Sequence, residues 1–312
     1  MDYFTIVQFA SGLALLLLSG YWLIPASVSS AHHIGIPPRL IASLIIAGGT
    51  SAPELLVSLD AGFSGNADIA WGNILGSNIA NIFLVGGLGL LILPITIDAG
   101  RDRKDISWLA GMTLLAALII YSDADDGMIR YVSGALLLLL FMLHTRISAQ
   151  AGTAAMNETP ESSPQFGLAV AIVTTLASIA GLVFGADLMV VSGVAIAQDF
   201  GVEQAVIGVT IVAIGTSLPE IAAVTASLLN RRSDMALGNI IGSNMFNLGI
   251  VLGLTLLATP LSASDALLQS NMVFFLTSML IMAVLIFTQA RLGTKTGAGF
   301  ILIYILFLIL EF

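Results

Sequence analysis

The segment Ala47–Asn81 reads AGGTSAPELLVSLDAGFSGNADIAWGNILGSNIAN, and the segment Ala213–Asn247 reads AIGTSLPEIAAVTASLLNRRSDMALGNIIGSNMFN. The second lies 166 residues after the first (213 minus 47) and aligns with it without a gap. Both contain the strings Gly-Thr-Ser-x-Pro-Glu and Gly-Asn-Ile-x-Gly-Ser-Asn-x-x-Asn. Chance can match apolar letters between hydrophobic segments but not both polar strings in register. The chain therefore contains an internal repeat.

The composition around the repeat indicates a polytopic membrane protein. Of the 312 residues, 57% are hydrophobic and 9% are charged, whereas an ordinary soluble domain has about 25% charged residues. The apolar residues form runs such as Phe4–Ile24 and Met272–Thr288, long enough to cross the hydrocarbon core as helices. This excludes a soluble enzyme and a disordered scaffold. The net charge of −9 argues against a nucleic-acid partner, and the absence of cysteine excludes a disulfide framework or a thiolate nucleophile.

Polar interruptions divide the chain into ten expected transmembrane helices, because only helices satisfy their own backbone groups in lipid. The expected spans are 4–24, 36–62, 69–96, 106–122, 128–148, 166–190, 203–228, 236–260, 271–289 and 296–311. They form a first five-helix repeat in residues 1–148, a linker in 149–164 on the inner side of the membrane and a second five-helix repeat in 165–312. The predicted fold class is an all-α polytopic membrane protein with broken helices at the membrane midplane.

The basic residues predict the orientation of these spans. If the N-terminus lies outside, nine of the ten Lys and Arg residues fall in inner loops and only Arg130 falls outside, which is a strong positive-inside pattern. Both termini are then expected outside. Five spans per half is an odd number, so the second repeat enters the membrane inverted. Inverted repeats with interrupted helices are typical of secondary transporters that bind substrate near the midplane, although channels can show them too.

The repeated Pro-Glu pairs predict an ion site. Glu54 and Glu220 fall near the middles of their spans, where a carboxylate costs at least ~2.5 kcal/mol and marks a functional site by default. No basic residue lies at comparable depth, so we favour a cation site over a structural ion pair. Pro53 and Pro219 interrupt the helices, and each frees backbone carbonyls that a cation can satisfy, around Gly49 and Thr50 in the first copy and Gly215 and Thr216 in the second.

The second polar string adds hydroxyl and amide oxygens. Asn73, Ser77 and Asn81 recur every fourth residue and share one helix face; the second copy repeats this face with Asn239, Ser243 and Asn247. The neighbouring glycines suit close helix packing. The amides of Asn78 and Asn244 point about 100° away, so interhelical hydrogen bonds and ion contacts both remain open for them.

The complete set contains oxygen donors only. Hard cations prefer such ligands, and Ca²⁺ takes 6–8 oxygens at about 2.3–2.6 Å. Two glutamates balance the charge of one Ca²⁺. Mg²⁺ is less natural because it requires tight octahedral geometry, and Na⁺ can use the same oxygens.

At these residues the chain resembles the cation/calcium exchanger superfamily, in particular its prokaryotic sodium/calcium exchanger branch, whose α-repeats carry both strings. The resemblance covers nearly the whole chain. Proton-coupled relatives typically have Gly-Asn-Ala-x-Glu in place of Gly-Thr-Ser-x-Pro-Glu, which favours Na⁺ as the counter-ion. By matching position, the resemblance implies that the ion ligands are Ala47 (backbone), Thr50, Ser51, Glu54, Ser77 and Asn81, and Ala213 (backbone), Thr216, Ser217, Glu220, Ser243 and Asn247.

The resemblance also implies alternating access, with three Na⁺ exchanged for one Ca²⁺ across the cell (inner) membrane of a prokaryote. Potassium-dependent relatives carry an aspartate where this chain has Asn247, so K⁺ co-transport is not expected. Gly48 stands where relatives usually carry a bulkier residue, a change that can loosen the helix at this point. The linker is too short for the calcium-sensing domains of animal relatives. The partners are Ca²⁺, Na⁺ and the lipid bilayer; we expect no cofactor and no obligatory protein partner.

Several other interpretations remain. The main alternative is a Ca²⁺/H⁺ antiporter in which Glu54 and Glu220 carry protons. An intramembrane hydrolase with two acids and an ion channel are less favoured. We give little weight to the EF-hand-like Asp123, Asp125 and Asp126, to the sequon at Asn157, to Asp187 near the outer boundary, and to the three histidines near inner helix ends.

Overall fold

The structure is a computed structural model that describes residues 3–122, 127–156, 164–200, 213–262, 265–288 and 291–311. The described residues form helices connected by short turns, together with one pair of two-residue strands. The elements of the first half are α1 (Tyr3–Ile34), α2 (Pro38–Ile41), η1 (Ala42–Ile46), α3 (Ala47–Thr50), α4 (Ala52–Phe63), α5 (Ala67–Ala80), η2 (Asn81–Val85), α6 (Gly86–Ile92), β1 (Ile95–Thr96), α7 (Asp102–Ile120) and α8 (Gly127–Met156). Those of the second half are α9 (Leu168–Asp199), α11 (Ala213–Thr216), α12 (Leu218–Leu229), α13 (Ser233–Phe246), η4 (Asn247–Leu252), α14 (Gly253–Ala258), α15 (Asp265–Thr288), β2 (Arg291–Leu292) and α16 (Thr294–Glu311).

The sequence repeat is also a repeat of local structure. The bounds of α3, α4 and α5 recur in α11, α12 and α13 with the same offset of 166 residues (47 to 213, 52 to 218 and 67 to 233). The π-helical turns η2 and η4 begin at the equivalent asparagines, Asn81 and Asn247. A π-helical turn is rare and is frequently found at functional sites. The shared strings therefore produce the same succession of helix, break, helix and π-turn in both halves.

The expected spans overlap helical segments wherever the structure describes them, but several boundaries are wrong. The sixth span, expected to end at residue 190, continues as α9 to Asp199. We expected the first span to end at residue 24, whereas α1 continues through Pro25 to Ile34. Its polar last turns are held by packing: Ser29 Oγ accepts a hydrogen bond from the Gln165 backbone nitrogen at 3.0 Å. The helix α8 continues to Met156, inside the expected linker, because its alanine-rich end favours helix.

Six helices in the described part of the chain are long and apolar enough to cross a membrane, or seven if the bent pair Pro38–Thr50 and Ala52–Phe63 is one span. The segments Leu218–Leu229 and Thr294–Leu310 are shorter apolar helices. The chain is thus an all-helical, multi-pass membrane protein. The arrangement of ten spans in two inverted repeats stays a prediction.

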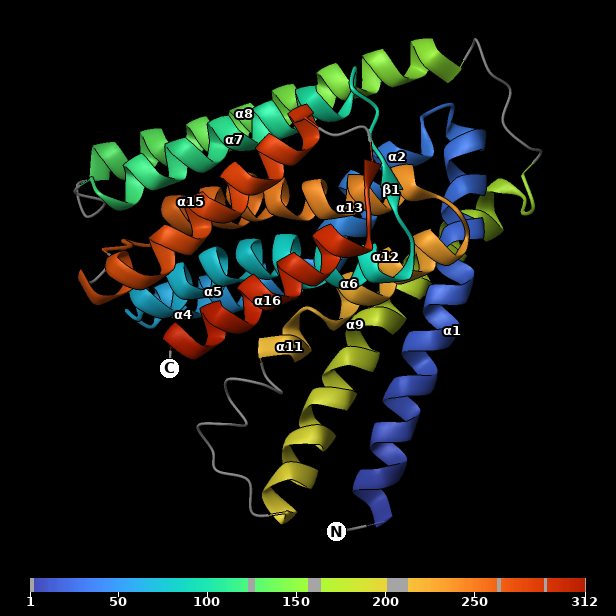
Figure 1. Cartoon of the computed structure of the whole chain (residues 1–312), viewed down its shortest axis with the longest axis horizontal. Helices are drawn as coiled ribbons and strands as arrows, with labels where there is room; N and C mark the ends of the chain where they lie inside the picture. The colour runs from blue at the N-terminus through green and yellow to red at the C-terminus, as the bar shows by residue number, and fades with distance from the viewer. Residues whose placement is uncertain are drawn as a thin grey trace.

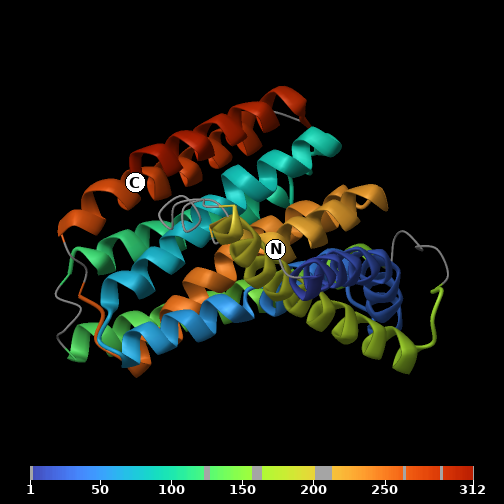
Figure 2. The ribbon, with the colours of Figure 1, turned by 90° about the horizontal axis from the view of Figure 1, so that it is seen from below.

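The helices form two groups (Figures 1 and 2). The long helices α1 and α9 run side by side and project away from the rest. Their contact is close because Gly12 and Gly185 face each other: a Cβ on either would lie within 3.0 Å of the other's carbonyl oxygen. The remaining helices pack around α5 and α13, which contribute Trp71, Ile74, Ile240 and Ile241 among others to the buried core. Many large apolar side chains on α1, α8, α9 and α15 are exposed, as expected for helices that face lipid.

Candidate cation-binding site

The two glutamates occupy equivalent places at helix breaks. α3 ends at Thr50 and α4 begins at Ala52, with Ser51 between them at φ −88° and ψ 8°; the two segments are bent by 45°. Proline favours the first turn of a helix, where its missing N–H costs nothing, so the Pro-Glu pair starts the second segment. Glu54 and Glu220 therefore lie in the first turns of α4 and α12, where the helix dipole favours a negative charge.

The structure brings these two carboxyl groups together from different halves of the chain. The hydroxyl of Ser51 donates to Glu220 Oε1 at 3.4 Å, and Glu220 lies within hydrogen-bonding reach of Thr50 and within electrostatic range of Glu54. The Ser77 hydroxyl lies within hydrogen-bonding reach of Glu54. The glutamates are 4% and 2% exposed. Among the described residues neither has an ion-pair partner, and one carboxylate oxygen of each is buried without any hydrogen-bond partner.

The backbone carbonyls at the first break have different partners. The N–H of Ser51 donates to the Ala47 carbonyl at 2.9 Å, and the Thr50 hydroxyl donates to the same oxygen at 3.2 Å. Pro53 has no N–H to donate to the Gly49 carbonyl four residues before it, so the expectation that Pro53 frees carbonyls around Gly49 and Thr50 stays a prediction. The Ala47 carbonyl carries two donors, and a cation bound there would compete with the Thr50 hydroxyl.

The expected amide and hydroxyl ligands lie on α5, α13 and the π-turns that follow. Asn81 and Asn247 are 3% and 0% exposed. In the second half, the amide atoms of Asn247 and the hydroxyl of Ser243 have no hydrogen-bond partner among the described residues. Oxygen atoms that are buried without partners are suited to bind a cation, since burial of an unpaired polar group otherwise costs free energy.

The remaining residues that the sequence singled out differ from one another in burial and in hydrogen bonding. Thr50 is fully buried, whereas the equivalent Thr216 is exposed. Ala213 begins α11, but the surroundings of its side chain lie outside the description. Asn78 and Asn244 donate to the carbonyls of Ile74 and Ile240 in their own helices, at 2.7 and 2.8 Å. Those amides therefore form hydrogen bonds within their own helices, which is neither the interhelical bond nor the ion contact that the sequence left open.

The role of Gly48 is a packing role that the sequence does not reveal. A Cβ at this position would lie 2.8 Å from the ring of Phe246, so glycine leaves room for a side chain of α13. The equivalent position in the second half is Ile214, whose side chain is exposed. The unusual glycine thus belongs to the contact between the two repeats.

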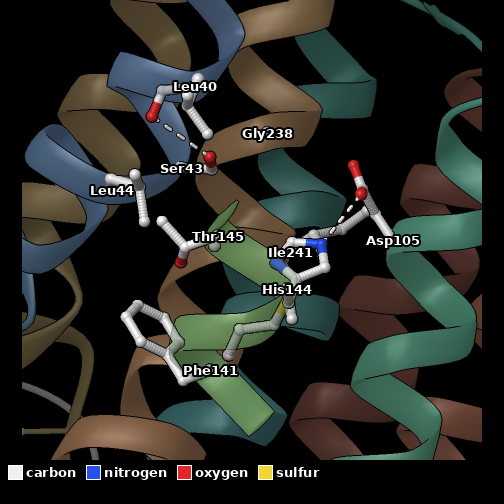
Figure 3. Close-up of a pocket in the computed structure, with 11 residues that line it drawn as sticks. Leu40, Ser43, Leu44, Asp105, Phe141, His144, Thr145, Gly238 and Ile241 are labelled. Atoms are coloured by element: carbon white, nitrogen blue, oxygen red, sulfur yellow. Dashed lines mark hydrogen bonds and ion pairs between the residues drawn. The ribbon is translucent and has the colours of Figure 1, made fainter. Parts of the chain in front are cut away.

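The structure contains a buried ion-pair network near the start of α2 that the sequence does not predict, because in the sequence its members are separate charges near expected loops. Arg39 is 6% exposed and contacts Asp102 at 2.5 Å and Asp105 at 2.9 Å. His144 contacts Asp105 at 3.0 Å, and the Ser148 hydroxyl lies 3.1 Å from the same histidine nitrogen. Figure 3 shows the His144 and Asp105 pair where α8 and α7 face each other. The sequence contains no repeat or motif that marks this network.

The network borders a tightly packed contact between α2, η1 and α13. A Cβ on Gly238 would lie 2.8 Å from Arg39, and one on Gly242 would lie 2.5 Å from the backbone of Ser43. The cavity beside this contact, lined by Leu40 among others, has a volume of about 10 Å³, at most the space of one water molecule. Figure 3 shows these segments around the cavity.

The remaining sequence features do not add a metal site. No group of three or more His, Cys, Asp or Glu side chains that could hold a metal lies within the described residues. Asp187 is exposed on α9. The acidic residues 123–126 and the sequon at 157–159 lie outside the described residues.

Comparison with known proteins gives a consistent result. The family model described as sodium/calcium exchanger protein matches residues 4–149 and 170–312. The putative antiporter CaxA of Alkalimonas amylolytica is 38% identical over 258 residues, which cover 80% of this chain and 79% of that protein. The sodium/calcium exchanger MaX1 of Methanosarcina acetivorans is 26% identical over 346 residues and 96% of each chain.

Among solved structures, the sodium-calcium exchanger NCX_Mj superimposes with a TM-score of 0.83 at 29% identity, covering 98% of each chain. The family and its structural neighbours are exchangers, not enzymes.

Proposed function

The chain belongs to the sodium/calcium exchanger protein family, and from this premise we propose that it is a secondary antiporter that exchanges Na⁺ for Ca²⁺ by alternating access. The observation that carries the proposal is the meeting of Glu54 and Glu220. Each lies in the first turn of a half-helix, both are buried, and Ser51 of one repeat is hydrogen-bonded to Glu220 of the other. Two carboxylates at a shared position balance the charge of one Ca²⁺.

The ligands that we propose are oxygens from both repeats. They are the carboxylates of Glu54 and Glu220, the hydroxyls of Thr50, Ser51, Ser77, Thr216, Ser217 and Ser243, the amides of Asn81 and Asn247, and the backbone carbonyls of Ala47 and Ala213. This number exceeds the 6–8 oxygens that Ca²⁺ takes, so different subsets can serve Ca²⁺ and Na⁺. Because the subsets share the two glutamates, Na⁺ and Ca²⁺ compete, and this competition couples their fluxes.

The exchange that we propose is electrogenic and independent of K⁺. Three Na⁺ against one Ca²⁺ moves one net charge per cycle, worth about 2.3 kcal/mol per 100 mV. Asn247 supplies an amide and not a third acid at the site, which supports a cycle without K⁺. No cofactor and no obligatory protein partner enter this mechanism; both cations are substrates.

We propose that the chain crosses the inner membrane of a prokaryotic cell ten times, in two inverted five-helix repeats, with both termini outside. The constant offset between equivalent helices and the concentration of Lys and Arg in alternate loops support this arrangement. The break at Ser51 and the one at Ser217 then lie near the midplane of the membrane.

The test is Ca²⁺ flux into proteoliposomes under imposed Na⁺, K⁺ or pH gradients. We expect an outward Na⁺ gradient to drive Ca²⁺ uptake, and K⁺ and pH gradients to have little effect. Glu54→Gln and Glu220→Gln should each lower Ca²⁺ affinity by roughly 10- to 100-fold, since contacts with charged groups contribute about 1.5–3 kcal/mol. Asp187→Asn, which removes an exposed acid from α9, is the matched control and should behave as the unmodified protein.

The same assay separates the alternatives. Ca²⁺ uptake driven by a pH gradient but not by Na⁺ would identify a Ca²⁺/H⁺ antiporter and overturn the Na⁺ assignment. Single-channel currents far above carrier turnover would identify a channel. Uptake that survives both glutamate substitutions would contradict the proposed site itself.

A further inference from the structure

Two equivalent asparagines lie one helical turn from the proposed site and have different surroundings. Asn73 on α5 donates its amide hydrogens to the Glu54 carbonyl at 3.0 Å and to the Ser58 hydroxyl at 2.9 Å. These bonds fix the amide to α4. Its equivalent, 166 residues later, is Asn239 on α13.

The second half lacks the partner that holds Asn73. The position equivalent to Ser58 is Val224, which is 1% exposed, with its side chain directed toward Gly89 of α6. Asn239 is also 1% exposed, and neither its amide nitrogen nor its amide oxygen has a hydrogen-bond partner among the described residues. Burying an amide without hydrogen-bond partners costs free energy and is rare in native proteins. We therefore expect the Asn239 side chain to bind a ligand.

The neighbours of Asn239 indicate the kind of ligand. Ser243 follows one turn later on the same face of α13, then Asn247. The hydroxyl of Ser243, the amide of Asn247 and one carboxylate oxygen of Glu220 are likewise buried without partners among the described residues. In the first half, by contrast, the Ser77 hydroxyl lies within hydrogen-bonding reach of Glu54. Asn239 and Ser243 on α13 and Asn247 at the start of η4 therefore form a row of unengaged oxygens, and Glu220 on α12 supplies a further one. Oxygen donors of this kind select hard cations.

We propose that Asn239 is a further cation-binding residue, whose amide oxygen holds partly hydrated Ca²⁺ or Na⁺ about one turn beyond Ser243, on the path between the site and the Arg231 turn. This inference rests on the proposed antiport. The second half differs from the first, where the Asn73 amide nitrogen donates to the Ser58 hydroxyl and to the Glu54 carbonyl. On the topology proposed above, the path is the inner passage, so Asn239 binds the ion that enters or leaves on the cytoplasmic side.

The test uses an exchange of the two supporting residues. Val224→Ser supplies Asn239 with the partner that Asn73 has, and Ser58→Val removes that partner from Asn73. Asn239→Leu removes the ligand, and Asn239→Asp keeps an oxygen at the same place. The readouts are the apparent KM for Ca²⁺ measured separately from each face of oriented vesicles, and equilibrium binding of ⁴⁵Ca²⁺ to the purified protein.

For Asn239→Leu we expect the KM at the cytoplasmic face to rise about tenfold, equivalent to ~1.4 kcal/mol, with less than a twofold change at the outer face. Val224→Ser should raise the same KM about threefold, Ser58→Val should leave it unchanged, and Asn239→Asp should retain Ca²⁺ binding. A KM that Asn239→Leu and Val224→Ser leave unchanged at the cytoplasmic face, or raise equally at both faces, would overturn the proposal.

Failure of the proposed function gives a different result. If the unmodified protein binds Ca²⁺ but a pH gradient drives its flux, the Na⁺ assignment fails, while the face-specific effect of Asn239→Leu still decides the present proposal. If the unmodified protein binds no Ca²⁺, both fail.

Discussion

Around Gly76 in the first repeat there is open space, whereas a Cβ at the equivalent Gly242 would lie 2.5 Å from the backbone of Ser43. The difference extends along both helices. Residues 72, 73, 76 and 77 on α5 are half-buried, and their equivalents 238, 239, 242 and 243 on α13 are buried. Thr50 and Thr216 differ in the opposite sense, since Thr50 is buried and Thr216 is exposed.

These differences form one pattern. The face of α5 that holds Gly76 is accessible, whereas the equivalent face of α13 is covered by α2 and η1; we call this covered face the closed side. Equivalent sequences thus pack in two different ways in one molecule.

The largest expected effect concerns Arg39, which secures the closed side and has no counterpart in the second half, where Ala205 takes its place. Arg39→Gln should lower the free energy of unfolding by about 3–5 kcal/mol, because it leaves the buried carboxylate of Asp102 without its partner. Thermal unfolding of the purified protein in detergent measures this. Lys104→Gln, which removes an exposed charge from the same helix as Asp102, is the control. Equal stability of the two variants would show that the network does not hold the closed side.

A smaller effect on stability is expected for alanine substitutions at the equivalent glycines Gly242 and Gly76. Gly242→Ala should cost about 1–3 kcal/mol of stability, since overpacking displaces η1 or α13, whereas Gly76→Ala should be close to neutral or stabilise α5 slightly. The same unfolding assay compares them. If α13 separates from η1 during the transport cycle, Gly242→Ala should also make the packed arrangement less favourable. Backbone amides of α13 and η1 should then exchange their hydrogens faster. Equal costs at the two positions would contradict the difference in packing.

The smallest effect tests the two turns that join the repeated helices. Gly65 has φ +74°, and the equivalent Arg231 has φ +57°, a conformation that only glycine adopts without steric cost. Arg231→Gly should therefore stabilise the protein by at most about 1 kcal/mol, and Gly65→Ala should destabilise it by a similar amount. A stability loss in Arg231→Gly would mean that the arginine makes contacts that outweigh the strain of its backbone.

Much of the fold follows from the sequence because the decisive signals are local. Pro53 and Pro219 each lie in the first turn of a new helical segment, a position that proline favours, so both breaks could be expected in place. The long apolar runs likewise predict helices, since lipid leaves the backbone no other partner. Boundaries were less predictable: α1 continues beyond Pro25 because its polar last turns find partners in a distant segment near Gln165.

In the candidate site, too, the local features could be predicted from the sequence and the long-range contacts could not. The residue types around Glu54 and Glu220 could be chosen from the strings alone, but the hydrogen bond between Ser51 and Glu220 joins residues 169 positions apart. The network of Arg39, Asp102 and His144 also depends on long-range packing, and no local pattern distinguishes its members from charges in solvated loops.

The sequence by itself determined that two copies of one structural unit exist and where each carries its oxygen-bearing residues, because repeated strings encode repeated local structure. Only the tertiary structure decided how the copies differ. Asn73 is held by Ser58 while Asn239 is not, and α13 is closed against η1 while the corresponding face of α5 is accessible. The physical reason is that hydrogen bonding within a helix depends on neighbouring residues, whereas access to a buried site depends on how separate helices pack.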